Sequence, residues 1–502
     1  MEANWDVIVV GGGGSGLASA LSATEQGARV LLLEKRPQLG GTTGIAVGSF
    51  TAAGTGLQQQ AGIEDHFQHH AEDVAHFADP DIEARNNHSL RTFFLNQAAD
   101  TLEWLQGLGL SFVGPHPEPP NRVPRMHNVV PGAKAYIAAF QLALQERTYQ
   151  QVCGAQVKEL LFDNGRVVGV VTEIDQIQKT FRAQRGVILA AGDYSSSSEL
   201  IGQHKGTDFK QIEGINPHAN GEGHQLAAQA GAQLVNMDVT YGPELRFVAS
   251  SKNPFQQWLP SAGLGARLLG AIARRMPKWC LRRLIKRLLV TWQHPENQLF
   301  DDGAILVNQH GNRFVNETRW PQRELAVANQ EGKVAYILLD GRLINRYSAW
   351  PHFISTAPDI AYAYVSDYRR LRADVTTQAG TLNEVAQQRG IPADSLAKTV
   401  AEFNRYIQGK QDDPHGRSDD PHLLEQSPWL LLGPVKAYFT TTEGGAAVNQ
   451  RLQVLNTDGQ PIPGLYAVGQ NGSGGIILWS HGLHIAWALT SGRLAGQAIM
   501  AD

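Results

Sequence analysis

The sequence predicts an α/β protein in which a Rossmann-like dinucleotide-binding domain, built from both ends of the chain, surrounds an inserted α+β cap domain. Three observations lead to this prediction. A strand, a Gly-rich turn, a helix and a second strand follow one another within residues 7–34. Glycine becomes frequent again between residues 444 and 475, ahead of a C-terminal helical stretch. The residues between these ends, about 241–424, mix helical and hairpin patterns of a different character.

Length and composition are those of a large globular enzyme. With 502 residues we expect two domains, residues 1–240 with 425–502 and residues 241–424. An apolar content of 42% and a charged content of 18% exclude a disordered, collagen-like or coiled-coil chain. The net charge of −4 excludes a globally basic nucleic-acid binder. Two cysteines provide neither a disulfide framework nor a zinc site, so we expect no metal. Without a signal peptide or an apolar run of 18 residues, we expect a cytoplasmic protein.

The N-terminal βαβ unit carries a dinucleotide-binding pattern. Gly11, Gly13 and Gly16 form GxGxxG between the strand 7–10 and the helical stretch 17–26. The first glycine allows the tight turn, the second lets the pyrophosphate approach the backbone, and the third lets helix and strand pack closely. The helix N-terminus offers unpaired N–H groups to the phosphates. Glu34 ends the second strand, where a carboxylate can accept hydrogen bonds from a ribose. NAD and FAD share this pattern.

The sequence also predicts strands and helices outside the N-terminal βαβ unit. An apolar strand spans residues 186–191 and ends at Gly192-Asp193, and a hairpin spans residues 162–173 with its turn at Asn164-Gly165. The insert contains a second hairpin-like stretch at 305–317, two helices within 382–406 and a polar loop at 408–420. The chain ends on a helix from about 482 to 501.

The residues after Glu34 narrow the choice of cofactor. They read Lys35-Arg36-Pro37-Gln38-Leu39-Gly40-Gly41-Thr42-Thr43. In this run the chain resembles the FAD-dependent fumarate reductase and succinate dehydrogenase flavoprotein family, which also contains the 3-ketosteroid dehydrogenases. The resemblance recurs, in family order, at residues 187–192, 220–224, 312–317, 444–445 and 463–470. Residues 255–295 match nothing in the family.

The resemblance implies a discontinuous Rossmann-like FAD-binding domain with a cap domain between its halves. It implies noncovalent FAD, because residues 40–44 contain no histidine to attach the flavin. The N-terminus of the last helix would point at the flavin, where a positive dipole end stabilises the reduced anion. The cofactor-binding residues it implies are Gly11, Gly13, Gly14, Ser15, Gly16, Glu34, Lys35, Gly41, Thr42, Thr43, Val157, Ala191, Gly192, Gly469, Gln470, Gly482 and Leu483.

The substrate is predicted from where the chain departs from the family. Family members that bind dicarboxylates carry a His before the C-terminal Gly-Gly and an Arg before the last helix, whereas this chain has Thr442 and Trp479 there. Fumarate is therefore not expected. Residues 479–483 are more similar to the ketosteroid branch, which favours a carbon–carbon bond beside the ketone of a hydrophobic cyclic substrate, with hydride passing to or from flavin N5. The alternatives are a reductase or oxidase of another unsaturated acid or ketone, with a separate electron carrier, or a flavin-binding electron-transfer subunit.

Several side chains are candidates for proton transfer. His481 titrates near neutral pH and could exchange the proton, and Ser480 falls on a position that the ketosteroid branch uses as a relay. The alternative role of His481 is to cap the last helix or to bind the flavin. Arg323 lies near the proton-donating arginine position of fumarate reductases, in competition with Arg319, and a structural salt bridge is the alternative.

Four further side chains are weaker candidates for the substrate site. Tyr438 and Tyr241 could hold a ketone oxygen, although core packing is the alternative for both. Arg125 and His127 precede Gly132 in a region where family members place a His near the substrate.

The last feature is a cationic stretch at residues 246–295, which contains ten Lys and Arg and no Asp or Glu. Bulky apolar residues recur at helical spacing within 255–295, with tryptophans at 258, 279 and 292. This combination is typical of a helix that lies on an anionic membrane, so we expect peripheral membrane contact. The alternatives are contact with an acidic partner subunit and, less compatible with a flavin domain, nucleic-acid binding.

Overall fold

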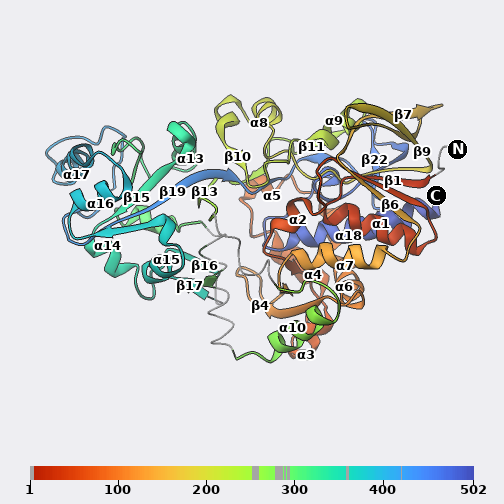
Figure 1. Ribbon diagram of the computed structural model, residues 1–502, viewed down its shortest axis with the longest axis horizontal. Coiled ribbons are helices and arrows are strands. Elements are labelled where there is room, and N and C mark those ends of the chain that lie inside the picture. Colours follow the sequence, from red (N-terminus) through yellow and green to blue (C-terminus); the bar gives the residue numbers. More distant parts are fainter. Residues whose placement is uncertain are drawn as a thin grey trace.

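The computed structural model describes residues 5–250, 259–277, 286–287, 290, 294–357, 361–419 and 421–502. Two lobes lie side by side along the longest axis (Figure 1). One lobe is built on a mostly parallel eight-stranded sheet, and the other on a six-stranded sheet. Each lobe has its own hydrophobic core. We call them the FAD lobe and the cap lobe, and the predicted α/β fold with an inserted α+β cap is confirmed.

The FAD lobe contains most of the first 229 residues together with the C-terminal strands and helix. Its elements are β1 (Trp5–Val10), α1 (Gly14–Glu25), β2 (Val30–Glu34), α2 (Gly41–Ile45), β3 (Ser49–Thr51), α3 (Gly56–Gln60), α4 (Phe67–Val74), α5 (Pro80–Glu83), α6 (His88–Gly107), β4 (Ser111–His116), β5 (Met126–Val130), α7 (Lys134–Leu144), β6 (Tyr149–Cys153), β7 (Ala155–Asp163), β8 (Arg166–Ile174), β9 (Ile177–Leu189), α9 (Glu222–Gln229), β22 (Gln453–Leu455), β23 (Pro461–Ala467) and α18 (Leu483–Ala501).

The main sheet joins distant parts of the chain. Its order is β22-β23-β9-β1-β2-β6, so β1 lies between β2 and β9, and β23 adds to the far edge of β9. Val9 pairs in parallel with Leu32 on one side and with Ile188 on the other. These strands are continuous runs of Val, Ile and Leu with no exposed face, as expected for a parallel sheet covered on both sides.

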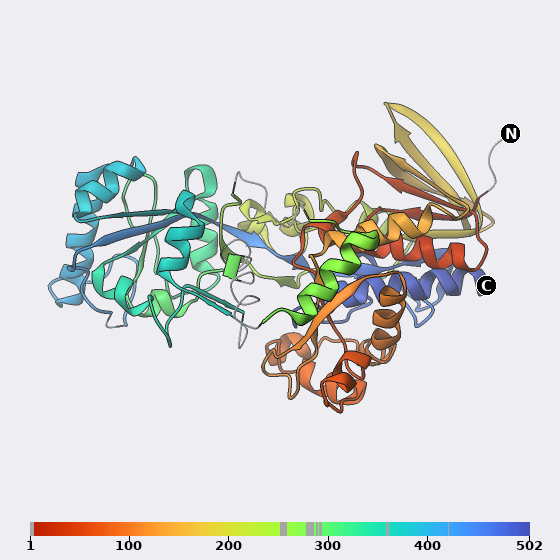
Figure 2. The ribbon, with the colours of Figure 1, turned by 60° about the horizontal axis from the view of Figure 1, so that its bottom comes forward.

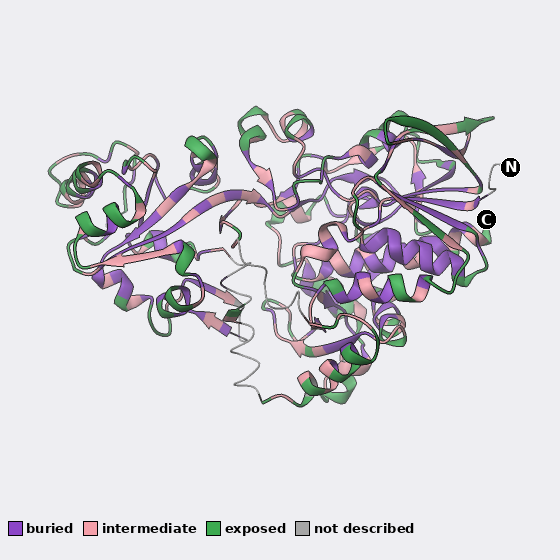
Figure 3. Cartoon of the chain, viewed as in Figure 1, coloured by how far each residue is buried: buried purple, intermediate pink, exposed green. Residues whose placement is uncertain are grey.

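Helices α1 and α18 pack closely on one face of this sheet. In Figure 3, α1 is coloured almost entirely as buried, whereas α18 alternates buried residues with more exposed ones. Small residues at the crossing allow the close approach. A Cβ atom at Gly492 would lie 2.4 Å from the Ser15 carbonyl oxygen, and one at Gly496 would lie 2.6 Å from that of Ser19. Contacts between α1 and α18 thereby join the N-terminal and C-terminal parts of the chain into one domain (Figure 1).

The cap lobe surrounds the central strand β19 (Trp429–Phe439). Its other elements include β10 (Glu213–Gly214), β13 (Glu244–Phe247), α12 (Gln298–Asp301), β14 (Ile305–Val307), α13 (Gln322–Ala328), β15 (Ala335–Leu339), α14 (Gly341–Arg346), β16 (Ser355–Ala357), β17 (Ala361–Ala363), α15 (Val365–Leu371), β18 (Thr376–Ala379), α16 (Leu382–Arg389) and α17 (Ala393–Ile407). Strand β19 pairs with β10, β13, β15 and β18. The sheets therefore divide after residue 439, whereas the sequence-based division placed residues 425–439 in the FAD domain.

Short elements connect the lobes: α8 (Ser198–His204), β11 (Leu234–Val235), β12 (Thr240–Tyr241), β20 (Thr441–Thr442) and β21 (Gly445–Ala446). The pairs β11–β21 and β12–β20 are antiparallel, so the outgoing and returning chains run side by side where the lobes meet.

Several local predictions are confirmed. The hairpin β7–β8 turns at Asn164 and Gly165, whose positive φ angles of 47° and 79° give the turn a twist that suits the flanking strands. The two helices within 382–406 and the last helix also form. Residues 305–317 were expected to pair as a hairpin. Instead β14 pairs with β15, and a single bridge joins Val307 to Arg313.

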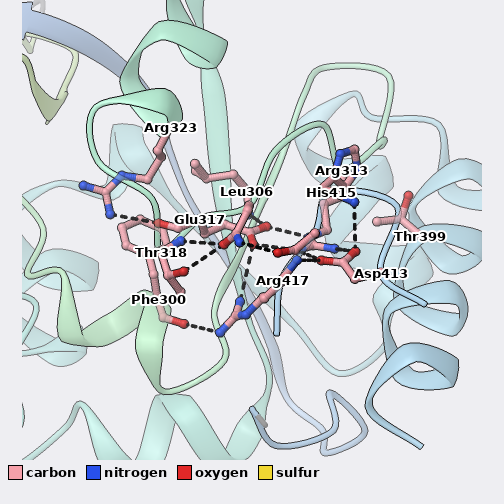
Figure 4. A network of polar contacts seen from close by, with 12 residues as sticks. Phe300, Leu306, Arg313, Glu317, Thr318, Arg323, Thr399, Asp413, His415 and Arg417 are labelled. Carbon is pink, nitrogen blue, oxygen red and sulfur yellow. Dashed lines mark hydrogen bonds and ion pairs between the residues drawn. The ribbon is translucent and has the colours of Figure 1, made fainter. Parts of the chain in front are cut away.

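The motif at 312–317 forms a buried ionic network in the cap lobe (Figure 4). The guanidinium of Arg313 donates 2.8 Å hydrogen bonds to both carboxylate oxygens of Glu317 and contacts Asp413. Arg417 lies 3.3 Å from Glu317 and donates to the Phe300 carbonyl. Because Glu317 is fully buried and also accepts the backbone N–H of Leu306, this network holds the loops of the cap lobe to its sheet.

Part of the cationic stretch is described. Helix α10 (Gly263–Arg275) packs across β4 of the FAD lobe, as Figure 2 shows. The expected amphipathic helix from Trp279 to Trp292 lies largely outside the described residues. Across the described part of the chain, we find no helix with both the length and the apolar character needed to span a membrane.

Candidate cofactor and substrate site

A cavity of about 560 Å³ runs from the glycine-rich turn of the FAD lobe to the cap lobe. Its walls come from both ends of the chain and from the insert. One end is lined by residues 10–15, 33–36 and 41–43, and the other by side chains of β13, α10 and the turn at 479–484. We describe these as the dinucleotide end and the substrate end.

The dinucleotide end has the geometry expected of a phosphate cradle. Gly11 adopts φ +110°, and a Cβ atom there would lie 2.4 Å from the Ala190 carbonyl oxygen. At Gly13, by contrast, a Cβ atom would meet nothing closer than 3.8 Å and would enter the cavity. The N–H groups of the first turn of α1 therefore face space that a pyrophosphate can fill. The residues present fit a bound dinucleotide.

Charged and polar side chains close this end. The Glu34 carboxylate accepts the Gly12 N–H at 2.7 Å and the Arg36 N–H at 2.8 Å, which fixes it beside the turn. Lys35 forms a 2.6 Å ion pair with Glu222, and the Asn216 amide donates to the Thr42 hydroxyl at 2.9 Å. Gln470 also lines the cavity, and its Oε1 is buried without a hydrogen-bond partner among the described residues.

Of the cofactor-binding residues expected from the sequence, fifteen line the cavity: Gly11, Gly13, Gly14, Ser15, Glu34, Lys35, Gly41, Thr42, Thr43, Val157, Ala191, Gly192, Gly469, Gln470 and Gly482. Gly16 and Leu483 do not. Gly16 packs α1 on β1, since a Cβ there would lie 1.9 Å from the Gly11 carbonyl oxygen, and Leu483 is buried in the core.

At the substrate end, His481 and Ser480 both line the cavity and both contact Glu118. The Nδ1–H of His481 donates to Glu118 Oε1 at 2.5 Å, and the Ser480 hydroxyl donates to Glu118 Oε2 at 2.8 Å. About half of the His481 side chain is open to the cavity. Burial would lower the pKa of His481, but the hydrogen bond and charge of Glu118, with Glu244, raise it above its ordinary value.

A second polar group enters from the cap lobe. Arg246 on β13 forms a 2.8 Å ion pair with Glu244 and donates to the Thr440 hydroxyl at 3.1 Å. Burial would raise the pKa of Glu244, but Arg246 and His294 lower it, so the carboxylate stays charged. Burial lowers the pKa of His294, against the attraction of Glu244.

The remaining walls of the substrate end are aromatic and apolar. Tyr241 contacts Trp479 edge-to-face with ring centroids 5.8 Å apart. The Nε1–H of Trp479 is buried and has no partner among the described residues. Helix α10 contributes one face to the cavity, with Leu269, Ala273 and Met276. His484 also lines the site and contacts the buried Glu443 at 2.8 Å.

The chain matches the protein-family model for the FAD binding domain over residues 6–252 and 282–479. The chain belongs to this FAD-binding family. The cofactor is therefore FAD, and the protein is an FAD-dependent oxidoreductase. The attachment of the flavin, expected to be noncovalent, stays a prediction.

The proteins and solved structures similar to this FAD-binding protein come from both branches expected from the sequence, the fumarate reductases and the 3-ketosteroid dehydrogenases. A probable fumarate reductase of Shewanella frigidimarina is 27% identical, over 98% of this chain and 74% of its own length. A urocanate reductase of Eggerthella lenta is 26% identical, over 93% and 69% respectively. The structure of a flavocytochrome c3 fumarate reductase in an open conformation matches with a TM-score of 0.72 at 26% identity, covering 99% of this chain and 78% of that one. A 3-ketosteroid Δ1-dehydrogenase from Sterolibacterium denitrificans has a TM-score of 0.64 at 18% identity, with 99% coverage of both chains.

These comparisons correct one expectation from the sequence, namely which branch of the family this chain resembles more in sequence. The branch expected to be nearer was the ketosteroid one, whereas sequence similarity at 25% or more is found with reductases of fumarate and urocanate. The ketosteroid dehydrogenase, at 18% identity, shares the fold.

Three candidate catalytic residues, Arg323, Arg319 and Tyr438, are not among the described residues that line the cavity. The Arg323 guanidinium is buried against Glu324 at 2.6 Å and donates to Asn297 at 2.8 Å, so it serves the salt bridge that was the alternative role. Arg319 is also absent from the described lining residues, and its guanidinium donates to the Gly416 carbonyl. Tyr438 lies on β19 between Glu213 and Glu244 of the neighbouring strands, and burial raises its pKa to about 12.

Arg125 and His127 are structural as well. Arg125 is fully buried in ion pairs with Asp65 and Asp73, at 2.7 and 2.6 Å. His127 lies between the Thr55 hydroxyl and the Phe50 carbonyl, and burial lowers its pKa to about 4.

Sequence reasoning missed the partners at the substrate end: Glu118, Glu244, Arg246, His294 and His484. Glu118 stands in the run Pro117-Glu118-Pro119-Pro120, and this acidic residue between prolines is the one local signal that could have found it. The other four residues belong to no sequence motif, because they come together only where the cap lobe contacts the FAD lobe.

Proposed function

We propose that this protein reduces, or in reverse forms, a carbon–carbon double bond conjugated to a carbonyl group, in a neutral or singly charged substrate with an apolar body. The observation that carries the proposal is the composition of the substrate end. It combines a histidine held by a carboxylate, a single paired arginine and an apolar wall from α10.

A small dicarboxylate needs two cationic or strongly donating partners. Among the described lining residues, the Lys and Arg side chains are Lys35 and Arg36 at the dinucleotide end and Arg246 at the substrate end. Arg246 already faces Glu244, and Glu118 adds a second carboxylate. This charge pattern disfavours fumarate and tolerates at most one substrate carboxylate.

The proposed reaction needs a hydride, a proton and a group that holds the carbonyl oxygen. Reduced FAD, when bound, supplies the hydride, which adds to the β carbon. The Nε2–H of His481 donates the proton to the α carbon, so the double bond becomes a single bond. The Trp479 N–H can donate to the carbonyl oxygen as its negative charge increases. A separate donor would supply two electrons to the flavin, and solvent would supply two protons, one to the flavin and one to His481.

The name of one relative, urocanate reductase, supports this class of reaction, because urocanate carries a double bond conjugated to a carboxyl group. A steroid-like cyclic enone is the substrate that the apolar wall of α10 favours within the class. An aryl-substituted acrylic acid is the second candidate, because Arg246 could shift from Glu244 to a single carboxylate.

The test is reoxidation of the reduced, FAD-loaded protein by a substrate panel without oxygen. The panel contains a steroid enone, a simple cyclic enone, cinnamate, urocanate and fumarate. We expect rapid reoxidation by an enone or aryl acrylate and little by fumarate. Fumarate as the fastest oxidant would contradict the proposal, and no reoxidation by any compound would favour the electron-transfer alternative.

We also propose that the protein contacts anionic membranes through α10. Leu264, Leu268 and Ile272 follow one another at intervals of four residues along this helix, with exposed fractions of 82%, 64% and 51%, and Ile272 also borders the cavity. Leu269 and Ala273 of the same helix line the cavity, so α10 forms part of the wall between the substrate end and the surroundings. The acid-free stretch 246–295 supplies the cations, each worth about 1 kcal/mol near an anionic surface.

Flotation with vesicles of phosphatidylserine and phosphatidylcholine, or of phosphatidylcholine alone, tests this contact. We expect binding that requires the anionic lipid and weakens in high salt. The variant Leu264→Ser/Leu268→Ser should bind less, whereas Ile177→Ser, an equally exposed apolar residue on β9, should not change binding. The idea fails if wild type and both variants remain unbound, or if the protein instead forms concentration-dependent dimers that Leu264→Ser/Leu268→Ser abolishes.

A further inference from the structure

Glu118 occupies a stiff and buried position at the substrate end. It is 5% exposed and lies between Pro117 and the pair Pro119-Pro120, whose rings restrict the backbone on both sides. The segment follows β4 directly, and Glu118 itself lines the cavity. A buried carboxylate requires partners that stabilise its charge, because burial alone strongly disfavours it.

Those partners all belong to the turn at residues 480–481. One carboxylate oxygen accepts the backbone N–H of His481 at 2.8 Å and its ring Nδ1–H at 2.5 Å. The other accepts the Ser480 hydroxyl at 2.8 Å. From the opposite side, the Thr51 hydroxyl donates to the His481 carbonyl at 2.6 Å. The backbone of His481 is therefore fixed at both its N–H and its carbonyl.

We propose that Glu118 is the positioning residue that orients the His481 ring and favours its protonated form, so that Nε2 presents a proton to the substrate. Since Nδ1 is occupied by Glu118, Nε2 is the ring nitrogen left to act. Ser480, expected from the sequence to relay a proton, becomes part of the support because its hydroxyl is directed to Glu118. This inference rests on the proposed function, in which His481 is the proton donor.

The charges around His481 determine how the rate should depend on pH. Glu118 and Glu244 favour the imidazolium, whereas Arg246 and His294 oppose it, and the balance raises the pKa of His481. A general acid works while it is protonated, so reduction should persist at neutral pH and fall as the pH rises through the raised pKa. Removal of the Glu118 charge should move this alkaline fall to lower pH.

The experiment uses Glu118→Gln, which keeps the size and an acceptor oxygen but removes the charge. The pKa of His481 is measured in the FAD-loaded protein by NMR of ¹³C-labelled histidine, with His481→Gln to assign the signal. The pH profile of substrate-driven flavin reoxidation is measured in parallel. The matched control is Glu331→Gln, which removes the carboxylate 3.1 Å from the exposed His310.

We expect Glu118→Gln to lower the pKa of His481 by about 1–3 units and to shift the alkaline limb equally. Glu331→Gln should change neither. An unchanged His481 titration in Glu118→Gln would overturn the inference. If the pKa of His481 falls but the pH profile of the rate does not move, His481 is not the proton donor. That result would contradict the proposed function, and this inference with it. If the variant does not fold, the wild-type titration decides, since a His481 pKa at or below about 6.5 contradicts the role.

Discussion

Gly13→Val should abolish FAD binding and leave the fold of the apoprotein intact, whereas Gly16→Val should destabilise the fold itself. Gly13 has φ −80° and ψ −172°, an extended conformation that valine adopts readily. A Cβ atom at Gly13 would lie 3.8 Å from the Gly41 Cα, an ordinary contact, and would project into the cavity. A Cβ atom at Gly16 would lie 1.9 Å from the Gly11 carbonyl oxygen, which requires α1 to move away from β1.

The size of the effect follows from what the new side chain displaces. Three carbon atoms would occupy space needed by the pyrophosphate, and overpacking of this kind costs about 1–3 kcal/mol. The valine side chain would also move the pyrophosphate away from the N–H groups of α1. Each charge-assisted hydrogen bond lost in this way costs about 1.5–3 kcal/mol. The lower limits of these terms sum to about 2.5 kcal/mol for a single lost bond, which weakens FAD binding by about 60-fold or more. The unfolding free energy of the Gly13→Val apoprotein should change by less than about 0.5 kcal/mol.

The assay combines two measurements on flavin-free protein. FAD is titrated while its fluorescence is followed, and urea unfolding of the apoprotein gives the stability of each variant. A Gly13→Val protein that binds FAD within threefold of wild type would refute the placement of the pyrophosphate. Equal destabilisation by Gly13→Val and Gly16→Val would refute the distinction between a glycine that faces the ligand and one that packs the helix.

Three further predictions test the cofactor, the chemistry and the cap. Denatured protein should release intact FAD, and flavin that stays with the precipitate would contradict noncovalent attachment. His481→Ala should retain FAD but slow substrate-driven reoxidation by about 10²–10⁴-fold, and a near-normal rate would assign proton transfer elsewhere. Glu317→Gln should lower the unfolding free energy by about 3–5 kcal/mol in urea titrations, because two buried guanidinium groups lose a shared carboxylate. As a control, Glu402→Gln at an exposed ion pair should lower the unfolding free energy by less than about 1 kcal/mol. Equal losses in the two variants would show that the buried network stabilises the fold no more than an exposed ion pair does.

The dinucleotide end was predictable because its determinants are local. Gly11, Gly13 and Glu34 lie within one βαβ unit, so their spacing alone fixes their arrangement once the strand and helix form. The hairpin at Asn164-Gly165 was predictable for the same reason, since the turn residues select the turn.

The substrate end was predictable only in part, because its contacts join distant segments. His481 was identified, but its partner Glu118 is 363 residues away in sequence. Arg125 looked equally available, and only the fold shows that Asp65 and Asp73 neutralise it. A lone charged residue has the same appearance in a sequence whether it meets a substrate or an ion-pair partner. Similarly, the apolar run of β19 could not show which of two sheets it joins.

The pairing of β23 with β9 and of α18 with α1 has a consequence for biosynthesis. The ribosome releases β1, α1 and β9 early, yet one edge of β9 and one face of α1 stay uncovered until residues 461–501 emerge. The cap sheet, whose last strand ends at residue 439, is complete before then. We therefore expect the nascent chain to fold from its middle outward and to gain the capacity to hold flavin only after residues 461–501 have emerged. A truncation before residue 461 should retain a protease-resistant cap and expose an N-terminal sheet that depends on chaperones.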